Sequence, residues 1–236
     1  MSVQSSLAEQ RRLIRSLLAP SAPEDALSAY YALFHDARRT ALTLHRSPTG
    51  RVGGFVAVCQ TGQDLFVPLV VLRCAQTVVG DLLRRALVTG RPYRLITVPA
   101  LREAVEAAMQ VERAQINHIY ILSDATLERE INVLVQSGQG PFRFEVRRDN
   151  RPIAAAGVNW QTDRLAELYV YVEPEFQRQG WGQAVAGATI DALVEARLLP
   201  LYTVAEENEA SRRLARALGF ADSGAREFEV VGRLCP

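Results

Sequence analysis

The chain has 236 residues, enough for one large or two small domains at roughly 100–200 residues each. With 48% hydrophobic residues, 22% charged residues and a formal net charge of +1, the composition is that of an ordinary globular protein and gives no electrostatic basis for binding nucleic acid. Three scattered cysteines and three isolated histidines favour a reducing compartment and argue against a metal site.

The N-terminus lacks the basic and apolar regions of a signal peptide. The longest strongly apolar run, Phe66 to Leu72, is far shorter than the ~20 residues that span a bilayer. We therefore expect a cytoplasmic protein with no membrane partner.

Hydrophobic periodicity and turn residues predict the elements of the first half. In chain order they are helices over Leu7–Leu18 and Pro23–Phe34, strands over Thr40–Arg46, Gly53–Gln60 and Leu65–Leu72, a helix over Val79–Leu87, a strand over Tyr93–Val98, a helix over Pro99–Met109 and a strand over His118–Leu122.

The second half opens with an expected helix near Ala125–Val135. Strands over Phe142–Arg147, Ile153–Asn159 and Leu165–Val172 follow, then a helix over Gly182–Ala196, a strand over Leu201–Ala205, a helix over Asn208–Leu218 and a strand over Phe228–Val231.

Both halves thus give the order strand, strand, strand, helix, strand, helix, strand, and Gln60-Thr61 aligns with Gln161-Thr162. The alignment also places Leu65–Leu72 on Ala166–Glu173. The repeated order favours an internal duplication, although two unrelated α/β segments can share it by coincidence. We expect an α/β (α+β) fold with two lobes, residues 1–123 and 124–236.

The segment with the clearest chemistry is 172–182, VEPEFQRQGWG, which joins a predicted strand to a predicted helix. Glycines at such a junction let backbone amides approach an anion, and the N-terminus of a helix favours negative charge. Successive amides of this kind form a nest for a pyrophosphate. The pattern Gln-x-x-Gly-x-Gly alone is weak evidence for a pyrophosphate-binding loop. Its place between a predicted strand and a predicted helix makes that evidence stronger.

With a second segment, 208–220, NEASRRLARALGF, the chain resembles the GNAT superfamily of N-acetyltransferases. The first segment is similar to the family's pyrophosphate loop, and the second to its Asn-x-x-(Ala/Ser) … Leu-Gly-Phe stretch. The resemblance covers about Phe142–Val231. It implies the acyl-CoA N-acyltransferase fold, a mixed, mostly antiparallel sheet flanked by helices, with acetyl-coenzyme A as cosubstrate.

The resemblance also implies roles for particular residues. Backbone groups of Val170, Tyr171 and Val172 pair with pantetheine as a neighbouring strand would. A β-bulge near Val172 aims its amide at the thioester carbonyl, where it stabilises the oxyanion. The pyrophosphate lies on the loop residues Gln177, Arg178, Gln179, Gly180, Trp181 and Gly182.

Several of these residues also have structural interpretations. Asn208 either hydrogen-bonds the pantetheine arm or caps a helix, which asparagine also favours. For Trp181, a helix residue that packs on the sheet is the better interpretation, and a ligand contact is the weaker one. The arginines of the last helix fit a solvated face better than phosphate ligands; they are Arg212, Arg213 and Arg216.

The chain departs from the family at Ala215, where many members carry a tyrosine that protonates the departing thiolate. Water or another side chain must then supply that proton. Glu167 is a candidate general base, but it precedes Val172 by five residues where some relatives show six, which changes the strand face unless a bulge absorbs it. Otherwise Glu167 is a polar cleft residue or a surface carboxylate.

Our leading hypothesis is an enzyme that transfers an acetyl or similar short acyl group from coenzyme A to an amine of a small molecule or protein. The alternatives are a catalytically silent acyl-CoA-binding regulator and a tandem acyltransferase with another acyl donor. We expect the first lobe to be a degenerate copy without coenzyme A, because Gln76 aligns with Gln177 whereas Val79 and Asp81 align with Gly180 and Gly182.

Overall fold

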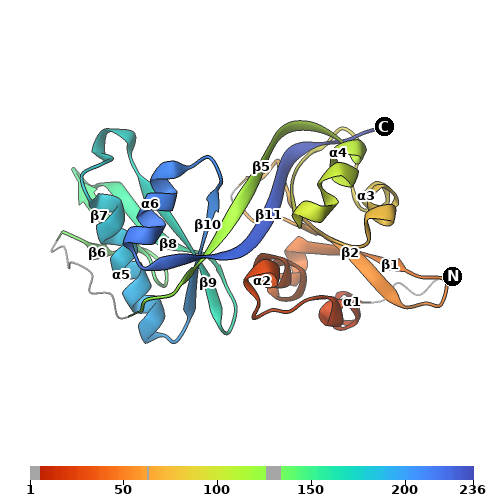
Figure 1. Ribbon diagram of the computed structural model, residues 1–236, viewed down its shortest axis with the longest axis horizontal. Helices are drawn as coiled ribbons and strands as arrows, with labels where there is room; N and C mark the ends of the chain where they lie inside the picture. The colour runs from red at the N-terminus through yellow and green to blue at the C-terminus, as the bar shows by residue number, and fades with distance from the viewer. Residues whose placement is uncertain (1–5, 63, 126–133) are drawn as a thin grey trace. The chain divides into compact units, whose positions relative to one another are not determined.

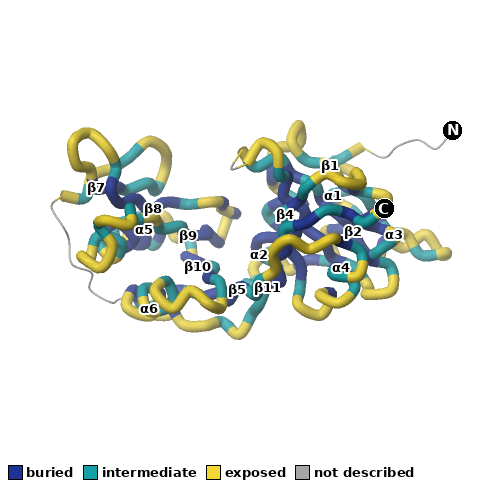
Figure 2. Tube along the Cα trace, turned by 90° about the horizontal axis from the view of Figure 1, so that it is seen from above, coloured by how far each residue is buried: buried dark blue, intermediate teal, exposed yellow. Residues whose placement is uncertain are grey.

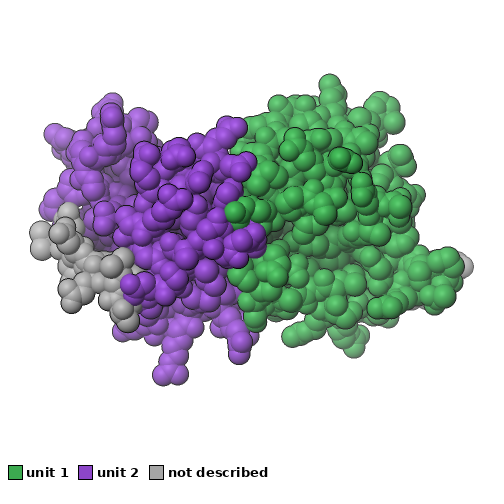
Figure 3. All heavy atoms as spheres, viewed as in Figure 1, with its two compact units in different colours: residues 1–117, 226–236 green, residues 118–225 purple. Residues whose placement is uncertain are grey.

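A computed structural model describes residues 6–62, 64–125 and 134–236 (Figure 1). The chain forms two compact units, coloured separately in Figure 3. Unit 1 comprises Met1–Asn117 with Arg226–Pro236, and unit 2 comprises His118–Ala225. The lobe boundary at 123/124 stays a prediction, since compactness divides the chain at 117/118 and again at 225/226. The helix expected near Ala125–Val135 falls mostly on residues 126–133, outside the described residues.

Unit 1 alternates short helices and strands. Its elements are α1 (Leu7–Ile14), α2 (Pro23–Ala29), β1 (Thr40–Arg46), β2 (Val52–Cys59), β3 (Leu69–Arg73), α3 (Val79–Ala86), β4 (Pro92–Thr97), α4 (Arg102–Ala108) and the start of β5 (Met109–Leu122). Helix α2 continues into a π-helical turn at Tyr30–Phe34, and α4 is entered through a 3₁₀ turn at Pro99–Leu101.

The sheet of unit 1 has the strand order β1-β2-β3-β4-β11-β5. Strand β3 is antiparallel to β2 and parallel to β4, and β11 (Phe220–Leu234) is antiparallel to β4. Helices α3 and α4 cover one face, where apolar side chains of both helices pack on β2, β3, β4 and β11. Figure 2 marks the buried residues along the trace in dark blue. Burial of this surface stabilises the unit.

Unit 2 contains the later elements. They are the end of β5, β6 (Gln136–Ser137), β7 (Phe144–Arg148), β8 (Arg151–Gln161), β9 (Leu165–Val172), α5 (Trp181–Glu195), β10 (Leu199–Ala205), α6 (Glu209–Ala217) and the start of β11. Strand β8 pairs antiparallel with both β7 and β9, and β10 pairs parallel with β9. Helix α5 packs on these strands and α6 packs on β10 and α5. None of the described helices is long and apolar enough to cross a membrane.

Each unit is therefore an open, mostly antiparallel sheet flanked by helices, as the sequence predicts. The predicted order of elements also holds in both halves: β1-β2-β3-α3-β4-α4-β5 and β7-β8-β9-α5-β10-α6-β11. The end of β5 lies in unit 2, whereas the end of β11 lies in unit 1, where Phe228–Arg233 pair with Pro92–Thr97. Each half of the sequence thus contributes its last strand partly to both units.

Three strand predictions need correction. Strands β5 and β11 are far longer than the predicted His118–Leu122 and Phe228–Val231. The prediction missed their first residues because these are mostly polar, half-buried or exposed and show no two-residue alternation of apolar side chains. The predicted strand Leu65–Leu72 begins only at Leu69. Upstream of it, the Asp64 carboxylate accepts hydrogen bonds from the backbone amides of Phe66 and Val67 at 2.8 and 3.1 Å, which holds a turn instead.

An ion pair between the half-exposed Arg94 and the buried Glu229 helps to hold β11 in unit 1. The guanidinium of Arg94 donates to both carboxylate oxygens of Glu229 at 3.0 and 3.1 Å, and Asn117 donates to the same carboxylate at 3.0 Å. Burial acts to raise the pKa of Glu229, but these hydrogen bonds and the Arg94 charge outweigh it and keep the pKa below its ordinary value. Glu229 is therefore ionised at neutral pH and links β11 to both neighbouring strands.

Because Phe228 has no exposed surface and packs in the core of unit 1, Phe228→Ala should lower the free energy of unfolding by about 3–5 kcal/mol. Urea denaturation measures this change. The matched control is Val231→Ala on the same strand, which removes a half-buried side chain and should cost clearly less. Equal losses in the two variants would contradict the placement of the C-terminal strand in this core.

Candidate functional site

The candidate site lies where two parallel strands of unit 2 separate. Strand β10 pairs with β9 over Leu199–Leu201 and Leu165–Glu167, after which the two strands diverge. The rest of β9 stays paired with β8 through Val172. A strand edge without a neighbour leaves backbone hydrogen-bonding groups available to a ligand.

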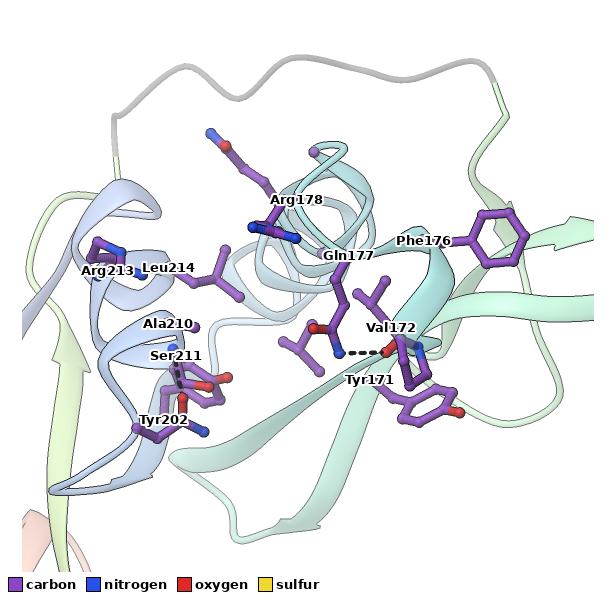
Figure 4. Close-up of a pocket in the computed structure, with 16 residues that line it drawn as sticks. Tyr171, Val172, Phe176, Gln177, Arg178, Tyr202, Ala210, Ser211, Arg213 and Leu214 are labelled. Carbon is purple, nitrogen blue, oxygen red and sulfur yellow. Dashed lines mark hydrogen bonds between the residues drawn. The ribbon is translucent and has the colours of Figure 1, made fainter.

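A cavity of about 660 Å³ fills this opening (Figure 4). Strand β9, the loop after it, the first turn of α5, strand β10 and the first turns of α6 form its walls. Its lining residues are Val170, Tyr171, Val172, Pro174, Phe176, Gln177, Arg178, Gly180, Gly182, Gln183, Tyr202, Asn208, Ala210, Ser211, Arg213 and Leu214. The cavity belongs entirely to unit 2.

The loop from β9 to α5 has a backbone shape suited to an anion. Arg178 and Gly180 both have a left-handed backbone, with φ of 61° and 83°, and Gly180 directly precedes the helix. Left-handed residues at a helix entrance are how proteins build concave nests of backbone amides. The side-chain amide of Gln177 donates to the backbone carbonyl of Val172 at 3.3 Å and ties this loop to the end of β9.

Gly182 keeps the floor of the cavity open. A Cβ atom at this position would lie 3.3 Å from a methyl carbon of Val172 and 3.7 Å from one of Val170. It would also lie 3.8 Å from a methyl carbon of Leu214. Any larger side chain would therefore project among the residues that form the walls. The N-terminus of the 15-residue helix α5 adds a favourable dipole for a negative group at the same place.

The opposite wall comes from β10 and α6. The Asn208 side-chain oxygen accepts a hydrogen bond from the Ser211 backbone amide at 3.0 Å, so Asn208 caps α6 while it also lines the cavity. Both interpretations of Asn208 from the sequence are thus compatible. Arg213 lines the cavity and lies 3.7 Å from Glu209, and 71% of its side chain is exposed.

The structure brings most of the predicted ligand residues to one cavity: Val170, Tyr171, Val172, Gln177, Arg178, Gly180, Gly182 and Asn208. Gln179 and Trp181 lie outside its lining, and the Trp181 indole donates to the Gln179 side chain at 3.2 Å. Sequence reasoning gave no role to Tyr202 or Phe176. No local pattern marks Tyr202, because its place depends on where β10 leaves β9.

Glu167 lies next to the cavity but does not line it. The residue is 7% exposed, and its carboxylate accepts a hydrogen bond from the Asn159 side chain at 3.2 Å. The bulge expected near Val172 is absent, since β8 and β9 pair regularly from Val172 to Leu168. The irregularity lies at Asn159, an extra residue of β8 between Val158 and Trp160, which brings its side chain to Glu167.

At the corresponding place in unit 1, a side chain joins the two parallel strands. Strand β4 pairs with β3 over Arg94–Ile96 and Leu69–Val71. The next residue, Thr97, is fully buried and donates its hydroxyl to the Leu72 carbonyl at 2.8 Å. The Arg73 guanidinium donates to the same carbonyl at 3.0 Å. These bonds occupy a backbone acceptor that a ligand between the strands would need.

The loop of unit 1 also differs in shape. It covers only residues 74–78, against 173–180 in unit 2, and no residue from 73 to 81 has a positive φ. Helix α3 begins at Val79 as α5 begins at Trp181, which corrects the predicted alignment by one position. Val78, with φ of −109°, therefore stands where Gly180 has its left-handed backbone, and Gly80 stands at Gly182.

In unit 2, two parallel strands of a mixed sheet diverge, and a glycine-containing loop and a helix N-terminus lie at the divergence. This is the architecture of an acyl-CoA-dependent acyltransferase. The acetyltransferase (GNAT) family matches residues 101–220, and the chain belongs to this family. Membership indicates acyl-CoA-dependent N-acyltransferase activity in general. Among the described residues, no cluster of three or more histidine, cysteine, aspartate or glutamate side chains could hold a metal ion.

Solved structures with the same fold are distant in sequence. A GCN5-related N-acetyltransferase from Kribbella flavida is 17% identical with a TM-score of 0.62, over 89% of this chain and 96% of that one. A tandem GNAT protein from the clavulanic acid biosynthesis pathway is 13% identical with a TM-score of 0.61, over 98% of this chain and 95% of that one. No curated protein matches the chain.

Because Gly182 has an ordinary backbone conformation, Gly182→Glu should fold but place a carboxylate in the cavity. We expect coenzyme A affinity to fall by at least about 100-fold, or about 2.7 kcal/mol, by calorimetry. Gly53→Glu on β2 is the matched control, because a side chain there meets only His45 at 3.8 Å. Unchanged affinity in folded Gly182→Glu would contradict the assignment of this cavity.

Proposed function

We propose that the protein transfers an acetyl or another short acyl group from coenzyme A to a primary amine in the cytoplasm. The observation that supports this most strongly is the cavity between β9 and β10, with a left-handed, glycine-containing loop at the N-terminus of α5. When bound, the thioester supplies an acyl group already activated for attack by an amine.

The residues present fit such a ligand. The loop Gln177–Gly182 would hold the pyrophosphate through its backbone amides, and Gly182 leaves the space that a Cβ atom would fill. On β9, residues Val170–Val172 pair with β8 along one edge and have no β10 partner on the other. That free edge would pair with the pantetheine arm, with Val172 at the end of the edge beside the pyrophosphate loop and Glu167 toward the thioester end.

The amine must lose a proton to become a nucleophile. We assign this role to Glu167, directly or through a water molecule. It lies on β9 at the last residue pair before the strands diverge, and its bond from Asn159 orients the carboxylate. Holding the amine and the acyl group side by side would supply much of the rate, because it replaces a collision by a positioned encounter.

We also propose that unit 1 descends from a second copy of the same domain and no longer binds coenzyme A. The same order of elements in the two halves and the fold likeness to a tandem GNAT protein support the duplication. The closed strand pair at Thr97 and Leu72 and the short loop without positive φ support the loss of binding.

The enzyme assay follows thiol release from acetyl-coenzyme A with a panel of primary amines. We expect turnover with at least one amine, and Glu167→Gln should lower kcat by about 10²–10⁴-fold without loss of coenzyme A affinity. Glu175→Gln, an exposed carboxylate of the next loop, is the control. Binding of coenzyme A without turnover of any amine would instead favour a silent acyl-CoA-binding regulator. Full activity of Glu167→Gln would exclude Glu167 as the base.

Calorimetric titration of the whole chain should give one coenzyme A per chain, because Thr97 joins the parallel strands of unit 1 at Leu72 and residues 73–81 beside them have no positive φ. In Gly182→Glu the stoichiometry should fall to zero, whereas a second site in unit 1 would leave one coenzyme A per chain. Two equivalent sites in the wild-type chain would contradict the loss of binding by unit 1.

A further inference from the structure

The cavity between β9 and β10 contains few groups that can give up a proton. Among its described lining residues, the ionisable side chains are the guanidinium groups of Arg178 and Arg213 and the phenols of Tyr171 and Tyr202. Tyr171 is 52% exposed, and the remaining acidic group is the phenol of Tyr202, which is only 6% exposed.

Tyr202 stands at the inner end of this cavity. It is the first residue of β10 after Leu201, the last one that pairs with β9. Figure 4 shows it beside Ser211 and away from Arg178. If the pyrophosphate lies at the loop near Arg178, a ligand that follows the free edge of β9 toward Glu167 brings its thioester end to Tyr202.

The surroundings of Tyr202 suit a proton donor. Burial raises its pKa, so the phenol stays protonated through the neutral range. A hydrogen bond with the Ser211 hydroxyl acts in the other direction and favours the ionised form. That bond would stabilise the phenolate at the moment when the proton leaves. Ala215, one helical turn beyond Ser211 on the same face of α6, is fully buried and has no hydroxyl of its own.

We propose that Tyr202 is the acid that protonates the leaving thiolate, an inference that rests on the proposed acyltransferase function. As the carbon–sulfur bond of the thioester breaks, its electron pair passes to sulfur, and sulfur takes the phenolic proton of Tyr202 to form the thiol. The phenolate is held by Ser211 and regains a proton from solvent. The proton lost by the amine leaves separately through the base, so charges and atoms balance.

Tyr202→Phe tests this role, because it keeps the ring and removes only the hydroxyl. We expect kcat with acetyl-coenzyme A to fall by about 10²-fold or more while KM and coenzyme A affinity stay unchanged. Tyr120→Phe is the matched control: Tyr120 is 1% exposed in the same apolar core but does not line the cavity. It should retain wild-type kcat.

Fluorotyrosine at position 202 gives a second readout. Ring fluorine lowers the phenol pKa, so the pH above which kcat declines should move downward, whereas a purely structural tyrosine would leave the profile in place. Wild-type kcat in Tyr202→Phe, a loss confined to coenzyme A affinity, or an unmoved pH profile would each overturn the proposal. If the wild-type chain releases no thiol with any amine of the panel, the proposed acyltransferase function itself is overturned, before any variant is compared.

Discussion

Strands β9 and β10 keep their backbone pairing over Leu165–Glu167 and Leu199–Leu201 and then separate, while β9 remains paired with β8. A strand held along one edge and free along the other is rigid and still has unused amides and carbonyls. The cavity, its lining residues and the position of Tyr202 all depend on this divergence. Without it, the loop before α5 would be only a surface turn beside a closed sheet.

Two glycines of the loop support the opening in different ways. Gly180 adopts a left-handed backbone directly before α5, a conformation that most side chains disfavour. Gly182 has an ordinary backbone, and its importance is steric, since a side chain would enter the space between Val172 and Leu214. Together they leave the N-terminus of α5 accessible to an anion of the size of a pyrophosphate.

Unit 1 repeats the order of elements of unit 2, but its strand pair and loop differ at the corresponding place. Thr97 in β4 and Tyr202 in β10 each follow the last residue that pairs with the neighbouring parallel strand. The short Thr97 side chain bonds the Leu72 carbonyl and closes the strands, whereas the Tyr202 hydroxyl bonds Ser211 on a helix. The same order of elements can therefore give a joined or a diverging strand pair, depending on the side chain at this position and on the loop beside it.

The sequence by itself determined the local features of this protein. The strand–loop–helix junction at 172–182, the cap at Asn208 and the repeated order of elements follow from glycine positions, capping residues and periodicity, which act over a few neighbouring residues. Only the tertiary structure decided the lengths of β5 and β11, the place of the bulge at Asn159, and the end of the β9–β10 pairing that puts Tyr202 in the cavity. These features depend on backbone pairing between segments far apart in the chain, and no pattern within one segment records its partner.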